Sequence, residues 1–284
     1  MTWLILGAGF TGSALARALR ARGEPGDSIV VTRRDREAAR QLAASLGVRG
    51  ERFDLADPAP LVVPPGAIVV CAAPPGRDPA GEIRRVIAAA AAAGARKLIY
   101  VSSTGVYGPG HGAWVDETAP IAPITASGHA RVAAEAALAA APVPWVALRA
   151  AGIYGPGRGL VERVRAGTYR VIGDGTCHVS RIHVDDLVAA ILAAAASPVT
   201  GAINAADDDP APIGHVADAV AARLGVPPPP RVDPATVSPE VAGMLTADRR
   251  IANRRLRDEL GVALRFPSWR DALDAELATG SSGR

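Results

Sequence analysis

The sequence has little of several features that mark other classes of protein. Its 284 residues include only two cysteines, Cys71 and Cys177. We therefore expect no structural disulfide and a reducing, cytoplasmic location. The net charge is only +3 at pH 7, and no Lys/Arg run typical of nucleic-acid binding occurs. The short basic pairs at 249–250 and 254–255 have the spacing of a solvated helix face.

Long hydrophobic runs are missing as well. Every apolar stretch of membrane-spanning length contains Pro, Gly or a charged residue, so we expect no contact with a membrane. The apolar N-terminus has no basic segment, and its first charged side chain is Arg17. This is unlike a signal peptide. No internal repeat occurs, and residues 279–284 are expected to form a frayed tail.

The first half of the chain alternates between strand-like and helix-like segments. Strands are predicted at residues 3–6, 28–32, 48–53, 67–71, 97–102 and 145–150. Helical patterns lie between them at residues 13–19, 36–46, 81–93 and 127–140. This alternation predicts an α/β protein of the Rossmann type, a doubly wound parallel sheet with helices on both faces.

The second half is less regular and rich in Pro and Gly. We predict an NAD(P)-binding Rossmann domain at 1–150 and a small substrate lobe at 151–284, with some elements returning to the Rossmann core. Asp185 is the expected N-cap of a helix. The acidic run at 207–209 is interpreted as a solvated turn, so no metal is expected.

The two alanine-rich helices at 81–93 and 127–140 leave two interpretations open. The high helix propensity of alanine explains them without further assumption. Small side chains also permit close packing against the same helices of a second subunit, so a homodimer through these helices is the other interpretation.

The first strand leads directly into the glycine motif GAGFTG. Strand, glycine turn and helix in this order predict a dinucleotide-binding site. Gly7 would make the tight turn, Gly9 would let the backbone approach a pyrophosphate, and Gly12 would let the helix pack close to the strand. Phosphates would bind at the helix N-terminus, where Phe10 and Thr11 lie. A glycine turn kept only for packing is the alternative.

The end of the second strand bears on the choice of dinucleotide. In NAD-preferring folds an acidic residue about 20 positions after the glycine motif binds the ribose 2′-hydroxyl. Here Thr32 is followed by Arg33 and Arg34. Two guanidinium groups suit a 2′-phosphate, so we expect NADP, with NAD possible. The alternative is that both arginines merely face solvent at a helix start.

Further cofactor contacts are expected where the third and fourth strands end. Asp54 ends the third strand, where it can bind the adenine amino group or cap the following turn. Ala72, Ala73 and Pro74 follow the fourth strand. Their small or rigid side chains would let the chain pass beside the cofactor ribose.

Several motifs in order resemble the extended short-chain dehydrogenase/reductase superfamily, the group of sugar-nucleotide epimerases and dehydratases. They are GAGFTG at 7–12, YVSSTGVYG at 100–108, WVDETAP at 114–120, LRAAGIYGPGR at 148–158 and RIHVDDL at 181–187. The resemblance covers nearly the whole chain. It implies hydride transfer to or from NAD(P) at a site made of Ser or Thr, Tyr and Lys.

The chain departs from that family at the Tyr and Lys. Ser103, before Tyr107, stands at the family's Ser/Thr position, but the segment SGHAR aligns with the family's YxxxK. Ser127 therefore takes the tyrosine position and Arg131 the lysine position. A serine cannot act as acid/base near neutral pH unless a strong base activates it. Arg131 can hold ribose hydroxyls but cannot exchange its proton.

Other residues are candidates for the missing acid/base. Tyr107 is the first of them, followed by Tyr154 and His111. For Arg131 the structural alternative is an ion pair with Glu135, four residues further along a helix.

The retained glycine motif and the lost YxxxK resemble the atypical short-chain dehydrogenase/reductases, especially the YeeZ-like group. The resemblance implies an NAD(P)-binding, oxidoreductase-like protein with hydride chemistry on a carbonyl or alcohol substrate. That substrate would lie between Ser103, Tyr107 and the C-terminal lobe. The alternatives are a non-catalytic NADP-binding sensor and a sugar-nucleotide epimerase with a relocated base.

Overall fold

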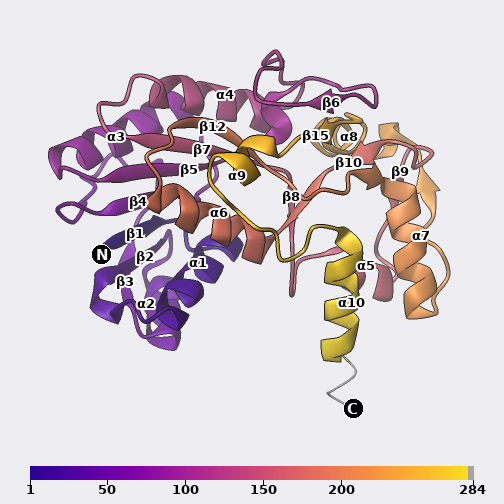
Figure 1. Cartoon of the computed structure of the whole chain (residues 1–284), viewed down its shortest axis with the longest axis horizontal. Coiled ribbons are helices and arrows are strands. Elements are labelled where there is room, and N and C mark those ends of the chain that lie inside the picture. The colour runs from indigo at the N-terminus through magenta and orange to yellow at the C-terminus, as the bar shows by residue number, and fades with distance from the viewer. Residues whose placement is uncertain (281–284) are drawn as a thin grey trace.

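The computed structural model describes residues 1–280, so residues 281–284 of the expected tail lie outside it. Its centre is a seven-stranded sheet in the order β12-β7-β5-β4-β1-β2-β3 (Figure 1). All neighbouring strands of this sheet pair in parallel. The strands are β1 (Trp3–Leu6), β2 (Ile29–Arg33), β3 (Arg49–Arg52), β4 (Ile68–Cys71), β5 (Lys97–Ser103), β7 (Trp145–Ala150) and β12 (Gly201–Ala205). The predicted Rossmann-type fold is confirmed.

Helices cover both faces of the sheet. They are α1 (Phe10–Ala21), α2 (Arg36–Leu46), α3 (Pro79–Ala92), α4 (Ala126–Leu138) and α6 (Val184–Ala196). Side chains of α1, α2 and α6 form a core with one face, and those of α3 and α4 form a core with the other. Because side chains alternate along a strand, Ile5 enters the first core and Leu4 the second.

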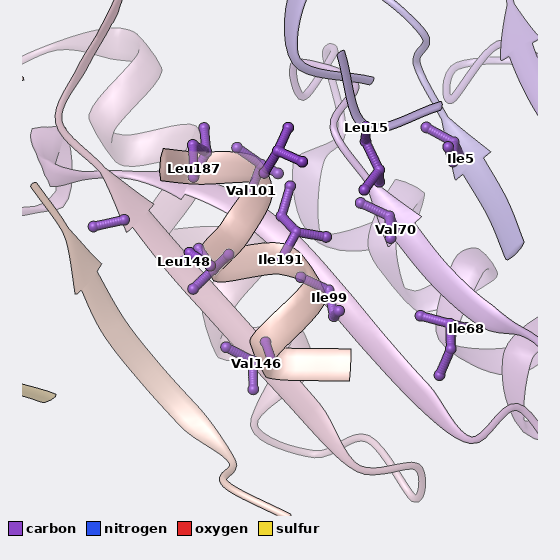
Figure 2. Close-up of a cluster of buried hydrophobic side chains, with 14 of the residues drawn as sticks. Ile5, Leu15, Ile68, Val70, Ile99, Val101, Val146, Leu148, Leu187 and Ile191 are labelled. Carbon is purple, nitrogen blue, oxygen red and sulfur yellow. The ribbon is translucent and has the colours of Figure 1, made fainter. Parts of the chain in front are cut away.

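The core under α6 shows how the sheet centre is filled. Leu187 and Ile191 of α6 lie over Ile99 of β5 and Leu148 of β7 (Figure 2). These side chains are almost wholly removed from water. Their burial fixes the centre of the sheet, at whose carboxyl edge ligands bind in folds of this type.

The last strand of the sheet, β12, is not among the strands expected from the sequence. It follows α6 and pairs with β7 from Gly201 to Ala205. Its sequence GAINA is short and contains a polar Asn, so this edge strand lacks the apolar run of the central strands. The polar side chain has a tertiary role, because Asn204 is fully buried and bonded to Tyr107.

The remaining elements lie mostly in the second half. The helices are α5 (Leu160–Arg165), α7 (Ile213–Leu224), α8 (Pro239–Leu245), α9 (Arg254–Asp258) and α10 (Trp269–Gly280), with the 3-10 turns η1 (Gly26–Ser28), η2 (Thr104–Val106) and η3 (Pro234–Thr236). The short strands are β6 (Trp114–Val115), β8 (Gly152–Tyr154), β9 (Val171–Ile172), β10 (His178–Val179), β11 (Arg181–His183), β13 (Ala211–Pro212), β14 (Arg231–Val232) and β15 (Arg250–Ile251).

A separate hydrophobic core holds the C-terminal lobe together. Val161 of α5, Val216 of α7 and both Trp269 and Leu273 of α10 belong to it. These helices lie to one side of the sheet (Figure 1). Between residues 1 and 280, no helix combines the length and the apolar character needed to cross a bilayer.

Two side chains from polar segments that were expected at the surface, Arg249 and Asp207, are buried instead. Arg249 is 9% exposed and donates to the carbonyl of Tyr107. Arg255 of the second basic pair donates to the Ala202 carbonyl at 2.6 Å. Asp207 is 1% exposed, and burial raises its pKa well above the ordinary range. The solvated-face interpretation is therefore wrong for Arg249, and the solvated-turn interpretation is wrong for Asp207, because distant segments cover both. Arg254 and Asp208 are exposed, as expected.

Candidate functional site

The glycine motif forms the tight turn between β1 and α1. Gly7 has a φ of +87°, and a Cβ on it would lie 2.6 Å from the amide nitrogen of Ala73. A Cβ on Gly12 would lie 2.6 Å from the Gly7 carbonyl oxygen. Both predicted roles, the turn at Gly7 and the close helix packing at Gly12, are confirmed.

Gly9 has different surroundings. No described atom outside its chain neighbours lies within 4 Å of a Cβ built on it. Gly9 is the N-cap of α1, which has neither a side-chain cap nor an acidic residue in its first turn. Free N–H groups and the positive end of the helix dipole therefore face this space. A pyrophosphate fits these donors, as expected for this motif.

Phe10 and Thr11 begin α1 beside this space. Thr11 is buried, and the guanidinium carbon of Arg158 lies 5.3 Å from the centre of the Phe10 ring. Arg158 belongs to the IYGPGR segment. That segment therefore lies next to the glycine turn, although the two are far apart in the sequence.

The end of β2 is attached to the same turn. Thr32 accepts a hydrogen bond from the Gly7 amide at 3.1 Å, and Arg33 Nε donates to the Ala8 carbonyl at 3.0 Å. This contact uses one of the five N–H donors of the Arg33 guanidinium. Arg34 is exposed. Both predicted arginines are thus at the β2 end, and Arg33 is fixed against the glycine turn.

The other residues expected around a dinucleotide lie at neighbouring strand ends. The amides of Ala72 and Ala73 both donate to the Leu6 carbonyl, at 2.8 and 3.0 Å, so the β4 exit lies against β1. Pro74 follows them and is exposed. Asp54 accepts from the Ala56 amide at 3.1 Å, which is the turn-capping alternative. A contact between Asp54 and adenine stays a prediction.

Helix α4 starts directly against the turn that carries Ser103. Its N-cap Thr125 accepts from the Gly128 amide at 3.1 Å. A Cβ on Gly128 would collide with the carbonyl of Gly105, so only glycine allows this approach. Ser103 itself accepts from the Gly105 amide at 3.0 Å. The Ser103 O–H can still donate a hydrogen bond to a substrate oxygen.

Arg131 lies one helical turn after Ser127 and reaches the end of β5. It donates to the Tyr100 hydroxyl at 3.1 Å and to the Val101 carbonyl at 2.5 Å. The expected alternative, an ion pair with Glu135, does not form. Glu135 instead pairs with Arg149 of β7 at 2.7 Å. Arg131 therefore lies at the carboxyl edge of the sheet, where the resemblance places a ribose-binding residue.

Tyr107 is a correction to the sequence analysis. Its side chain is 1% exposed. Its hydroxyl donates to Asn204 at 2.7 Å and accepts from Arg149 at 2.8 Å. Burial raises the pKa of this phenol, although Arg149 opposes the effect. The expectation that Tyr107 faces a substrate and relays its proton is wrong, because the hydroxyl belongs to a buried network.

That buried network also positions α4. Ser102 of β5 donates to Glu135 at 2.5 Å, Glu135 pairs with Arg149, and Arg149 joins Tyr107. The Glu135 carboxylate and the Arg149 guanidinium thus link α4 and β7 to Ser102 of β5 and to Tyr107. The hydroxyl of Tyr154, the second candidate for the acid/base, is buried with no hydrogen-bond partner among the described residues, and burial raises its pKa strongly. It therefore does not face a substrate either.

Ser127 has a partner that the sequence analysis missed. Its hydroxyl donates to the Glu240 carboxylate, and its amide lies 3.4 Å from the other oxygen of that group. Glu240 belongs to α8 and stands 113 residues away in the sequence. No local motif marks it, so only the tertiary structure could find it. No group of three or more metal-binding side chains occurs in the described part of the chain.

Comparison with known proteins agrees with this geometry. The sequence model of the NAD dependent epimerase/dehydratase family matches residues 3–206. The chain belongs to that family. A functionally unknown conserved protein from Silicibacter pomeroyi DSS is 36% identical over 98% of both chains, with a TM-score of 0.83.

Two further family relatives have described properties. A 3-diazoavenalumate denitrifying reductase from a Streptomyces species is 41% identical over 123 residues, which are 42% of this chain and 40% of that protein. A human epimerase family protein, solved with NADPH, is 22% identical with a TM-score of 0.77 over 97% of this chain and 98% of that one. At this identity the human protein shows the fold alone. A bound NAD or NADP is typical of such family members.

Proposed function

We propose that this chain is an NADP-dependent oxidoreductase that acts on a carbonyl or alcohol substrate. The observation that carries the proposal is the β2 end, where Arg33 is fixed on the glycine turn and Arg34 is exposed. The nearest carboxylate, Asp35, accepts from the Ala38 amide at 2.7 Å and caps α2. The side chains available to bind the 2′ substituent of the ribose are therefore arginines, and the carboxylate of Asp35 is already used as a helix cap.

The residues of the site would divide cofactor binding and substrate orientation among them. When bound, the nicotinamide supplies or accepts the hydride. The α1 N-terminus and Gly9 would bind its pyrophosphate, and Arg131 would bind the ribose hydroxyls. The Ser103 hydroxyl would orient the substrate oxygen. The reductase from Streptomyces and the human relative solved with NADPH support this assignment, as does the YeeZ-like resemblance of the site segments.

A titration tests the cofactor assignment. Purified nucleotide-free protein is titrated with NADPH and with NADH, followed by fluorescence. We expect micromolar NADPH binding and NADH binding weaker by about tenfold or more, which is about 1.4 kcal/mol. The double substitution Arg33→Ser and Arg34→Ser should remove this preference, because the 2′-phosphate loses its donors.

The matched control is Arg40→Ser on the exposed face of α2, where the arginine pairs with Glu37 at 3.9 Å. It should leave the preference intact. Equal affinity for both cofactors in the wild type would contradict the assignment of NADP. No binding of either would contradict the oxidoreductase itself and favour an interaction role.

The second candidate is a non-catalytic NADP-binding sensor that regulates a partner protein. Residue 127 is a serine where the family resemblance places a tyrosine, and Tyr107 is buried. Both observations favour the sensor. NADPH binding without turnover of any carbonyl in a broad panel, together with cofactor-dependent capture of a partner, would select the sensor. Tight binding of a UDP- or GDP-sugar would instead select an epimerase.

The proposal includes a cytoplasmic location, which the two free cysteines support. It includes a small-molecule substrate and neither nucleic acid nor a membrane as a partner. It also includes a homodimer through α3 and α4, which is one of the two interpretations of their alanine-rich sequences.

A further inference from the structure

We propose that Ser127 and Glu240 form the proton path of this site, with Ser127 next to the substrate and Glu240 behind it. The inference rests on the proposed oxidoreductase function. The family resemblance leaves Ser127 without the acidity of a tyrosine. A serine becomes competent when a neighbouring base accepts its proton, and the structure shows a carboxylate in that position.

Ser127 lies near the start of helix α4. It shares a face of α4 with Arg131, because residues four apart on a helix are neighbours. Arg131 reaches Tyr100 and Val101 at the end of β5. The backbone at Gly128 lies against Gly105, in the turn that follows Ser103. Ser127 is therefore at the carboxyl edge of the sheet, where a substrate oxygen would meet Ser103.

Ser127 is in contact with Glu240 of α8. The Ser127 hydroxyl donates to one carboxylate oxygen, and the Ser127 amide approaches the other at 3.4 Å. Helix α8 also lies close to α4 at another point, since a Cβ on Gly243 would be 2.8 Å from Cγ2 of Thr125. Two separate contacts thus hold the carboxylate in front of the hydroxyl.

The Ser127 and Glu240 side chains are open to solvent. Ser127 is exposed and Glu240 is partly exposed, so a substrate can reach the hydroxyl and water can reach the carboxylate. Tyr107 and Tyr154 lack this access because both hydroxyls are buried. Glu240 is thus a carboxylate in contact with a residue of the predicted site, and it is open to proton exchange with solvent.

The chemistry balances in both directions. For carbonyl reduction, the carbonyl carbon receives a hydride, supplied by a nicotinamide dinucleotide, and the C=O π bond breaks. The oxygen takes the proton of the Ser127 hydroxyl, which recovers one from the Glu240 carboxyl, and solvent recharges Glu240. For alcohol oxidation, the proton moves from substrate to Ser127 and from Ser127 to the Glu240 carboxylate as the hydride leaves.

Other titratable groups lie on the elements around α8. Asp233 caps η3 through the Ala235 amide at 2.8 Å, and Arg131 is bonded to β5. The Sγ of Cys177 lies 3.8 Å from the carbonyl oxygen of Thr246, at the end of α8. Burial raises the pKa of the Cys177 thiol. His129 is exposed on α4. Because His129 lies on the same helix as Ser127, a pH profile must separate its contribution from that of Glu240.

The test compares Glu240→Gln, Ser127→Ala and the double variant with the wild type. The assay is NADPH-dependent reduction of nitrobenzaldehyde and of the best carbonyl in the panel. We expect each variant to lower kcat about a hundredfold, as for loss of a general acid/base. The double variant should be no worse than either single one, because the residues act in sequence. The Kd for NADPH should stay within about twofold of wild type.

Two readouts separate a proton path from a merely structural contact. An ionisation in the pH profile of kcat should be present in the wild type and in His129→Gln, and absent in Glu240→Gln. Infrared spectra of cofactor-free protein labelled with ¹³C-glutamate should show a carboxylate band that shifts in Ser127→Ala. Asp274→Asn removes a carboxylate of an exposed pair with Arg223 and should change none of these readouts.

The outcomes are distinguishable. An active wild type with equally active Glu240→Gln, or an unshifted carboxylate band in Ser127→Ala, overturns the proton path while the oxidoreductase function stands. A wild type that binds no NADPH, or binds it and reduces no carbonyl, overturns the proposed function and the proton path together.

Discussion

Gly7, Gly9 and Gly12 belong to one motif but differ in what surrounds them. A side chain at Gly7 or Gly12 would meet backbone atoms of the protein itself at 2.6 Å. A side chain at Gly9 would meet no described atom within 4 Å. Two of the glycines are therefore required by the fold, and the third is required only if a ligand approaches it.

Alanine substitutions at the residue scale test this difference. Gly9→Ala should leave the free energy of unfolding within about 1 kcal/mol of wild type and weaken NADPH binding about tenfold or more. Gly12→Ala should cost about 1–3 kcal/mol of stability, because the helix must move away from the strand. Thermal unfolding and fluorescence titration measure both. A Gly9→Ala protein that binds NADPH normally would exclude a close approach of the pyrophosphate.

At the scale of elements, helix α6 begins in a way that the sequence analysis did not predict. Asp185 was the expected cap, but the N-cap is His183, whose Nδ1 accepts from the Asp185 amide at 3.2 Å. The imidazole is 3% exposed and lies 4.1 Å from the Phe266 ring, centre to centre. Burial lowers the pKa of His183 below 6.5, against the opposing effect of Asp185 and Asp186.

This cap predicts a loss of stability in mild acid. The neutral imidazole is the form that caps α6, while the unfolded chain takes up a proton at its ordinary pKa. The contribution of His183 is therefore complete above pH 6.5 and is lost as the pH falls towards the lower folded-state pKa, by up to about 1.4 kcal/mol per pH unit. Denaturant unfolding of wild type and His183→Asn between about pH 7.5 and 5 measures it.

Asparagine is chosen because it can still cap a helix but does not titrate. The difference between wild type and variant should shrink as the pH falls. His129→Gln, an exposed histidine on α4, is the control and should follow the wild type. A constant difference across the pH range would show that protonation of His183 does not limit stability.

At the scale of the whole molecule, α3 and α4 pack against each other on one face of the sheet (Figure 1). Ala88 and Ala92 of α3 and Ala136 of α4 are exposed. Small exposed side chains on adjacent helices allow a second copy to approach closely, which keeps the homodimer as a prediction. The other interpretation is that the alanines only allow α3 and α4 to pack closely against each other within one chain.

Light scattering after size-exclusion chromatography tests the assembly. We expect a dimer for the wild type and a monomer for Ala136→Arg, because a buried arginine without a partner is costly at an interface. Ala44→Arg, at an exposed position of α2, should leave the dimer unchanged. A monomeric wild type, or a dimeric Ala136→Arg, would show that α4 is not the interface.

The fold and half of the site follow from local patterns in the sequence. Strand and helix periodicity determine the parallel sheet, because each strand must bury its apolar residues on both faces. The glycine motif, Arg33 and the N-cap of α4 can also be identified locally, since each lies in a short segment whose sequence pattern marks it. Ser127 and Arg131 were assigned through the resemblance of the segment SGHAR to the family's YxxxK.

What the tertiary structure alone decided are the contacts between segments far apart in the chain. Tyr107 is buried because Asn204 and Arg149 reach its hydroxyl, and Arg249 is buried because it bonds the Tyr107 carbonyl. Glu240 meets Ser127 across 113 residues of sequence. Periodicity reports which face of its own element a residue occupies, but not which distant side chain that face will meet.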